Sequence, residues 1–421
     1  MKTIFHNFTL IDGTGNPPQE NALLEIQSSK ITYAGQDLGY AQTDSKTIKV
    51  DLGGRVMIPG LIDTHVHLSG SGEPDSHFMA PDPEMLLIML KNAQRNLAAG
   101  ITTVRDVGGW NELEFALRKA IQKGDQVGSR LVLAGRFISI TEAGAPYYAG
   151  MYREADGVDD VRKAVREQIK HGADLIKFGV TGAVLVEDGA PGATHFNRDE
   201  MVAGVQEAKK FGKRVSAHAH GVEGIRLAVE SGADSIEHGT FLHQDPDLIR
   251  LMAEKGVFLV PTLQAGWAVI EDKKHQIPNW IIEKSLPIQE DAVMSLVLAY
   301  KAGVPIAMGS DAATPLNYHG ENALEIYWMQ QAGMSAMDAL VAATGNAARA
   351  LGCEGSLGTL QVGKIADLVV LNTNPLTNLR SLADKNEIYF VMKDGLIAAA
   401  NKDINLTGKL CANQVLYNSS I

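Results

Sequence analysis

The sequence PGLIDTHVH at residues 59–67 joins an apolar run to two histidines that are separated by one valine. Residues 56–62 are apolar and predict a β-strand. Because residues i and i+2 of a strand point to the same face, His65 and His67 can converge on one point beyond the end of this strand. Two imidazoles held in this way suit a divalent metal such as zinc. The pair alone also fits ordinary surface histidines, so the rest of the chain has to decide between the two interpretations.

One local pattern recurs through the middle of the chain. A helix-like stretch ends at a residue followed by glycine, and an apolar strand follows closely. Glycine suits this place because the residue after a helix often needs a left-handed conformation. The pattern occurs at Gly100, Gly172, Gly212, Gly232, Gly256 and Gly303. Apolar residues at three- and four-residue spacing predict the helices, at residues 84–98, 158–170, 198–210, 222–230 and 291–301.

Together with predicted strands at residues 56–62 and 130–133, this pattern gives strands that alternate with helices as far as about residue 350. Such an alternation predicts an α/β fold, a (β/α)8 TIM barrel over residues 56–355. A doubly wound sheet is the alternative. It usually begins with a glycine-rich phosphate-binding turn, which the sequence lacks.

Both ends of the chain differ from the middle and have the pattern of short strands separated by turns. Residues 388–393 and 396–399, joined by Asp394 and Gly395, are typical of a β-hairpin. Neither end alone has enough strands to bury one face of a sheet. We therefore expect residues 1–55 and 356–421 to meet in one small β-sandwich domain beside the barrel.

The composition is that of an ordinary globular protein of 421 residues, of which 45% are hydrophobic and 21% charged. A net charge of −11 argues against a nucleic-acid partner. The first residues carry no long apolar core, and no apolar run is long enough to cross a bilayer, so we expect neither a signal peptide nor a membrane span. Only Cys353 and Cys411 are present, which is no disulfide framework and favours a cytoplasmic location.

Polar side chains lie near the ends of the predicted barrel strands, where the active sites of this fold are found. They are His65, His67, Lys177, His218, His238 and Asp311. Each alone has an ordinary explanation, since strand-end histidines are often core residues, a lysine can reach solvent and an aspartate can cap a helix. All six at one rim of a barrel indicate a metal centre instead.

These residues and their flanking motifs resemble the amidohydrolase superfamily, and within it the imidazolonepropionase-like branch. In that branch the sequence is most similar to zinc-dependent prolidases (Xaa-Pro dipeptidases) and arginine-type carboxypeptidases. The resemblance covers essentially the whole chain. It is carried by PGLIDTHVH (59–67), GITTVRD (100–106), GADLIK (172–177), SIEHGT (235–240), GSDA (309–312), GNAAR (345–349) and GKIADLVVL (363–371).

The resemblance implies a homo-oligomeric hydrolase of small molecules with two divalent metal ions, usually zinc. The implied ligands are His65, His67 and Asp311 for the first ion, and His218 and His238 for the second. Lys177 would react with carbon dioxide to give a carbamate that bridges both ions, and a buried lysine with a lowered pKa can react in this way. A hydroxide shared by the ions would attack the amide, and Asp311 would deliver its proton to the leaving nitrogen.

The sequence departs from the peptidase relatives in two places. His220 stands where they often have a tyrosine, and the segment after the third strand reads SITEAGAP (139–146) instead of glycine-glycine-histidine. We interpret His220 and His319 as candidate substrate-binding residues, with a loop-stabilising role as the alternative for His319. Further candidates to shape the pocket lie in the same long loop: Arg136, Tyr147, Tyr148 and Arg153.

Three functions remain open from the sequence. The first is metal-dependent hydrolysis of an amide bond in a dipeptide, an N-acyl amino acid or a related small amide. The second is a cyclic-amide hydrolase or deaminase with one metal, which Lys177 argues against because mononuclear relatives generally lack this lysine. The third is a non-catalytic barrel protein, which the presence of all six implied ligands argues against.

Overall fold

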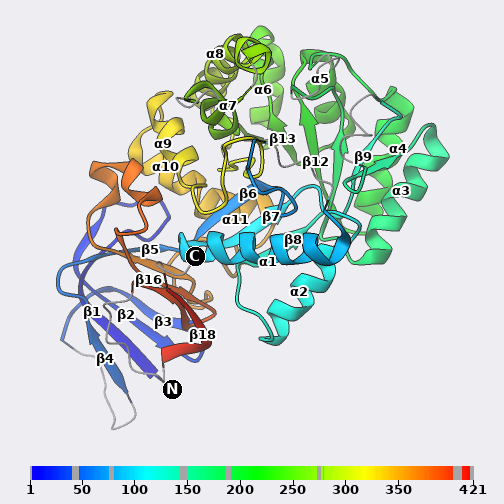
Figure 1. The fold of residues 1–421 in the computed structure, drawn as a ribbon. Coiled ribbons are helices and arrows are strands. Elements are labelled where there is room, and N and C mark those ends of the chain that lie inside the picture. The colour runs from blue at the N-terminus through cyan, green and yellow to red at the C-terminus, as the bar shows by residue number, and fades with distance from the viewer. Residues whose placement is uncertain are drawn as a thin grey trace.

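The computed structural model describes residues 2–39, 47–74, 80–142, 149–184, 191–272, 276–277, 279–401 and 410–417. Figure 1 shows two parts, a barrel surrounded by helices and a group of strands at the lower left that includes the N-terminus. The strands of the second part come from both ends of the chain, blue and orange to red in the figure. The predicted α/β fold is therefore confirmed, with strands from both termini lying together.

Parallel strands form the barrel. In chain order they are β6 (Leu61–Val66), β7 (Ile101–Asp106), β8 (Arg130–Leu133), β9 (Phe137–Ser139), β11 (Leu175–Gly179), β12 (Arg214–Ala219), β13 (Ser235–His238) and β14 (Phe258–Val260). The third barrel strand is interrupted, so that β8 pairs with β7 and β9 pairs with β11. The short strand β10 (Tyr152–Glu154) extends the sheet beside β9.

Residues 306–308, predicted as the eighth strand, close the barrel between β14 and β6. The Ala307 amide donates to the Leu259 carbonyl at 3.0 Å, and the Thr64 amide donates to the Met308 carbonyl at 2.9 Å. The segment makes a parallel bridge at Ile306 but is too short to form a regular strand. The barrel is therefore closed as predicted, with a reduced last strand.

The helices of the barrel follow the predicted alternation. They are α1 (Asp82–Ala98), α2 (Leu113–Lys123), α3 (Val158–His171), α4 (Arg198–Lys210), α5 (Val222–Ser231), α6 (Pro246–Lys255), α7 (Leu263–Ile270), α8 (Asn279–Lys301), α9 (Leu324–Gln331), α10 (Ala336–Ala342) and α11 (Gly345–Leu351). The 3-10 helices are η2 (Leu242–Gln244), η3 (Pro375–Thr377) and η4 (Leu379–Ala383). Gly172 and Gly232 end α3 and α5 with φ of 103° and 100°, as the helix-to-strand pattern required. Helix α8 begins well before its predicted start at residue 291 and contains Pro287.

Strands from the two ends of the chain form one nine-stranded sheet. They are β1 (Lys2–Leu10), β2 (Gln19–Gln27), β3 (Lys30–Gln36), β4 (Ile48–Asp51), β5 (Val56–Pro59), β15 (Leu368–Leu371), β16 (Ile388–Lys393), β17 (Leu396–Ala400) and β18 (Cys411–Tyr417). Strands β1 and β16 are not neighbours in this sheet, yet Phe5 and Phe390 meet with their ring centroids 5.8 Å apart. The sheet is therefore folded over on itself around a core of its own.

The prediction of a single strand at residues 56–62 is wrong, because the chain forms two strands there that are separated by Gly60. Strand β5 pairs with β1 and β15 in the terminal sheet, and β6 begins the barrel. A Cβ atom at Gly60 would lie 2.3 Å from the Thr102 hydroxyl, so only glycine lets the chain pass this close to β7. The hairpin predicted at Asp394 and Gly395 is confirmed, with both residues at positive φ as a tight turn requires.

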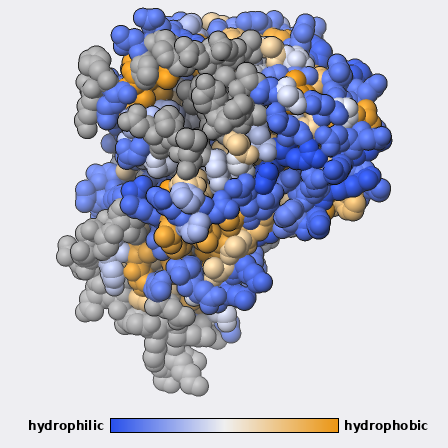
Figure 2. Space-filling model, turned by 45° about the vertical axis from the view of Figure 1, so that its right-hand side comes forward, coloured by the Kyte–Doolittle hydropathy of each residue, from blue (hydrophilic) through white to orange (hydrophobic). Residues whose placement is uncertain are grey.

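The visible face of the molecule in Figure 2 is mostly hydrophilic on its right-hand side, and apolar residues gather in a band near its middle. None of the helices in the described ranges is long and apolar enough to span a membrane.

Candidate metal centre

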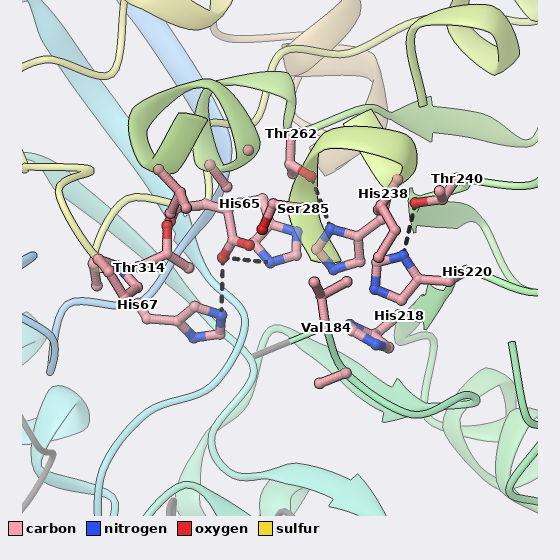
Figure 3. A pocket seen from close by; sticks show the side chains of 18 of the residues that line it. His65, His67, Val184, His218, His220, His238, Thr240, Thr262, Ser285 and Thr314 are labelled. Atoms are coloured by element: carbon pink, nitrogen blue, oxygen red, sulfur yellow. Dashed lines mark hydrogen bonds and ion pairs between the residues drawn. The ribbon is translucent and has the colours of Figure 1, made fainter. Parts of the chain in front are cut away.

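The six predicted metal ligands and His220 line one cavity of about 380 Å³. Figure 3 shows the labelled histidines converging on it, from the ends of β6, β12 and β13. His65, Lys177 and His218 lie within β6, β11 and β12, and His238 is the last residue of β13. The structure thus brings together side chains that are far apart in the sequence.

Asp311 lies between the two histidines of the HxH motif. Its Oδ1 atom is 3.4 Å from Nε2 of His65 and 3.4 Å from Nε2 of His67, as the dashed lines in Figure 3 mark. The rings of the two histidines meet edge to face with their centroids 5.4 Å apart. This group corresponds to the ligand set that the family resemblance implied for the first ion.

Three further histidines form the other side of the cluster. The ring centroid of His218 lies 4.5 Å from that of His238 and 4.7 Å from that of His220. The rings of His220 and His238 stack 4.8 Å apart. One ligand atom from each of these three residues lies within 4.8 Å of the others, and the same holds for His65, His238 and Asp311. His220 therefore belongs to the same cluster as His218 and His238, the two histidines predicted to bind the second ion.

Hydrogen bonds fix which nitrogen of each ring faces the cavity. His67 Nδ1 lies 3.3 Å from the Gly108 carbonyl, and His218 Nε2 lies 3.3 Å from the Gly182 carbonyl. A carbonyl oxygen can only accept, so these nitrogens carry the proton. The lone pairs are then on Nε2 of His67 and Nδ1 of His218, which are left to bind a ligand.

Threonine hydroxyls hold the remaining pair of rings. His238 Nδ1 lies 2.8 Å from the Thr262 hydroxyl, and His220 Nδ1 lies 2.7 Å from the Thr240 hydroxyl. Each contact leaves Nε2 as the second ring nitrogen available to the cavity. Thr240 and Thr262 lie just beyond β13 and β14, so neighbouring strand ends orient these two rings.

Burial keeps four histidines of this cluster neutral: His67, His218, His220 and His238. It lowers the pKa of His67 to about 3 and the pKa of His220 to about 4. It also holds the pKa of His218 and of His238 well below the usual range. Neutral imidazoles are the form that binds metal.

The pKa values of Lys177 and Asp311 are both lowered, which leaves the lysine partly uncharged and the aspartate charged. Burial lowers the pKa of Lys177, which is 1% exposed, to about 8. Burial opposes ionisation of Asp311 as well, but the electrostatic influence of His65, His67 and Lys177 favours the carboxylate, outweighs burial and lowers the pKa of Asp311 to about 2. Asp311 is therefore a carboxylate at neutral pH, and part of Lys177 is an uncharged amine.

Three residues at successive strand ends have left-handed backbone conformations, namely His238 (φ 69°), Thr262 (φ 53°) and Asp311 (φ 56°). Such conformations cost of order 1–3 kcal/mol for residues other than glycine and persist where the surrounding structure enforces them. At His238 the change of direction lets Glu237 and His238, which are adjacent in the chain, both contact His65. Regular strand alternation would place them on opposite faces.

Glu237 is the main residue that the sequence analysis missed. Its carboxylate accepts from His65 Nδ1 at 2.8 Å and from Arg105 at 2.8 Å, and it is fully buried. Burial opposes its ionisation, but Arg105 and His65 hold the pKa of Glu237 well below its usual range. The hydrogen bond makes Nδ1 of His65 the donor and leaves Nε2 facing Asp311. The motif SIEHGT contained this residue, but only the fold pairs it with β6.

His319 does not line the cavity. It is buried, its Nε2 lies 3.0 Å from the His67 carbonyl, and its Nδ1 lies 3.0 Å from the Asn96 amide. Both ring nitrogens are used within the protein, which favours the loop-stabilising alternative over contact with substrate.

The two arginines proposed to shape the pocket point elsewhere. Arg136 pairs with Glu112, and Arg153 pairs with Asp160 and Glu167. Among the described residues of this loop, Phe137, Met151 and Tyr152 line the cavity instead. Tyr147 and Tyr148 lie outside the described residues.

The donor set fits divalent metal ions. The side chains that converge on the cavity offer imidazole nitrogens with free lone pairs and one carboxylate. Several lone pairs facing one another across a buried space repel unless a cation lies between them, and the bonds to Gly108, Gly182 and Glu237 fix the rings in this orientation.

The fold and this cluster define the class of protein. Residues 56–398 match the model of the amidohydrolase family. The match spans most of the chain, and the protein belongs to the amidohydrolase family.

Individual relatives agree with this assignment. The chain is 31% identical to an ochratoxinase from Aspergillus niger, over 93% of this chain and 86% of that protein. It is 28% identical to an imidazolonepropionase from Rhizorhabdus wittichii, over 85% and 90%. The crystal structure of a Xaa-Pro dipeptidase with bound methionine superposes with a TM-score of 0.85 at 32% identity, over 94% of this chain and 99% of that one. The predicted family, its imidazolonepropionase-like branch and the likeness to prolidases are thereby confirmed.

Proposed function

We propose that this protein is a metal-dependent hydrolase that cleaves the amide bond of a small substrate such as a dipeptide or an N-acyl amino acid. The observation that carries the proposal is the convergence of neutral histidines, a carboxylate and a buried lysine on one cavity of about 380 Å³. A cavity of this size accommodates a small molecule. Family membership supports the reaction type.

In this proposal the chain holds two divalent ions, and zinc is the expected metal because imidazole and carboxylate ligands suit it. The ligands are His65, His67 and Asp311 for one ion, His218 and His238 for the other, and Lys177 between them. Bound ions would polarise the amide carbonyl and supply a water-derived nucleophile at neutral pH.

Asp311 is the proposed proton carrier. With a pKa of about 2 it is ionised at neutral pH and can accept a proton from the attacking water. Its position against Nε2 of both His65 and His67 keeps it at the centre of the cluster. The same carboxyl group would then donate the proton to the nitrogen that leaves.

Lys177 is the proposed bridging ligand. A pKa of about 8 leaves about a tenth of the amine uncharged at pH 7. The uncharged Nζ can form a bond to the carbon of carbon dioxide and release one proton, which gives a carbamate with two ligand oxygens. Burial favours the neutral amine, because Lys177 is 1% exposed and its ammonium form would lose its hydration.

Metal content and activity test the proposal together. Protein loaded with zinc and bicarbonate should contain two metals per chain and hydrolyse members of a panel of dipeptides and N-acyl amino acids. His65→Ala should lose metal and activity, whereas the matched control His171→Ala, at an exposed helix end, should keep both. One metal per chain at full activity would contradict the two-ion site and favour a mononuclear deaminase or cyclic-amide hydrolase.

The bridge is tested separately at Lys177. Lys177→Ala should be nearly inactive and should recover partly when short carboxylic acids are added, because these can replace the carbamate oxygens. Carbon-13 NMR of the zinc-loaded protein prepared with labelled bicarbonate should detect the carbamate carbon. An active protein with no labelled carbamate would contradict this role.

A further inference from the structure

Helices α7 and α8 form an apolar wall on the cavity. The apolar residues of this wall are Ala265 and Val269 on α7 and Ile281, Ile288 and Ala292 on α8. On α8 the spacings of seven and four residues place the three side chains on one face of the helix. Val269 and Ala292 are buried, at 2% and 7% exposed, and the other three residues of the wall are half-buried.

Two polar side chains interrupt this wall, and one of them is already committed to the protein. Gln289 donates from Nε2 to the Leu263 carbonyl at 3.0 Å, which ties α8 to the first residue of α7. Ser285 lies one turn before Gln289 on the same face and is labelled at the cavity in Figure 3. Its hydroxyl can bond to an uncharged polar atom but does not balance an ionic charge.

Charged groups of the described cavity lining lie almost entirely on the side of the proposed metal ligands, away from α7 and α8. Among the described lining residues the only cation is Lys177, and the only carboxylate besides Asp311 is Glu73. Glu73 is exposed and belongs to neither α7 nor α8, so it is not part of the wall. A charged group against α7 and α8 would lose part of its hydration without gaining an ionic partner among the described residues that line the cavity there.

We propose that this wall selects the substrate, and that the protein acts on amides carrying an uncharged apolar group opposite the scissile bond. The inference rests on the proposed amide hydrolysis and adds the substrate class. Burial of apolar area on the wall favours binding of such a group, and a charged group of the same length finds no countercharge among the described wall residues. Acidic and basic side chains are therefore disfavoured at this end of the substrate.

The wall can be tested by binding, without turnover. The two probes are 5-phenylpentanoate and adipate, which share one carboxylate and a four-carbon chain and differ in carrying a phenyl ring or a second carboxylate. On zinc-loaded protein we expect calorimetry to give at least about tenfold tighter binding of 5-phenylpentanoate, the lower value for burial of a phenyl group. Equal or tighter binding of adipate would overturn the proposal.

A pair of variants locates the effect on α8. Ile288→Asp places a charge on the wall and should reduce the preference for 5-phenylpentanoate by at least about tenfold. The matched control Leu286→Asp places the same charge on the outer side of the same turn, where Leu286 is 46% exposed, and should keep the preference. Ile281→Asp serves as the second wall variant if Ile288→Asp does not fold. Equal effects of wall and control variants would contradict the assignment.

The binding test and the activity screen separate the two proposals. Amide hydrolysis that favours substrates with charged ends would overturn the wall's role and leave the proposed function standing. If zinc-loaded protein cleaves none of the amides, the proposed function fails, and the preference between the two probes still decides what the wall binds.

Discussion

Replacement of Glu237 by glutamine should weaken metal binding and destabilise the fold at once. The carboxylate accepts from His65 and Arg105 and also from the hydroxyl of Ser216 at 2.7 Å. Glutamine keeps the shape but removes the charge beside a buried arginine and turns one of two acceptor atoms into a donor. Breaking a buried ion pair from one side costs about 3–5 kcal/mol. Loss of the partner that orients a metal-binding histidine costs about 10–100-fold in metal affinity.

Both effects can be measured on the same preparations. Urea unfolding of the metal-free protein gives the change in the free energy of unfolding, and competition with a chelator gives the zinc affinity. The control is Glu230→Gln, which removes a carboxylate from a surface pair with Arg198 and should cost less than about 1 kcal/mol. If Glu237→Gln keeps the wild-type zinc affinity and unfolds like the control, the carboxylate does not position His65.

Three other changes test separate parts of the structure. Asp311→Asn should lower kcat by at least about a hundredfold, because proton transfer takes place in the transition state. Zinc content and KM should change little. If steady-state assays show a raised KM at unchanged kcat, Asp311 is a binding residue and not the proton carrier. Gly266→Ala would place a Cβ atom 1.9 Å from Gln289 Oε1, so the amide should be displaced and KM should rise more than kcat falls. Burial and the charge of Asp106 raise the pKa of Glu114 well above its usual 4.5, so the folded protein holds a proton that the unfolded chain releases. This carboxyl group therefore contributes a free energy of unfolding that falls as pH rises above about 4.5. In urea titrations at several pH values, the free energy of unfolding of Glu114→Gln should fall less, or rise more, with pH than that of the wild type; the same pH dependence in both proteins would contradict this role.

The barrel and the candidate ligands could be predicted because their signals are local. A glycine at a helix end, an apolar run and a polar residue at the end of that run lie within a few residues of one another, and parallel strands bring such ends to one rim. His238 and Asp311 could be placed there from the sequence alone. The division of residues 56–62 could not, because it depends on the close approach of Gly60 to Thr102, which lies on another strand.

The residues that orient the ligands were harder to predict for the same reason. Glu237 follows Ile236 in a buried strand and has no spacing that distinguishes it from a structural residue. Its role depends on contacts with His65 and Arg105, which lie 172 and 132 positions away in the chain. The tautomers set by Gly108 and Gly182 are equally invisible, because any residue supplies a carbonyl oxygen.

The metal side of the cavity and its apolar wall meet at the beginning of α7. Thr262, immediately before this helix, contacts Nδ1 of His238, and the wall residue Ala265 follows three positions later. Glu325 on α9 accepts from the amides of Leu263 and Gln264 at 3.0 and 2.6 Å, which satisfies amides at the start of α7 that have no partner within the helix. The side chain of Glu325 therefore anchors the start of the helix that carries part of the proposed wall, next to the threonine that contacts a candidate ligand. A change in α9 that moves α7 must alter metal binding and substrate preference together.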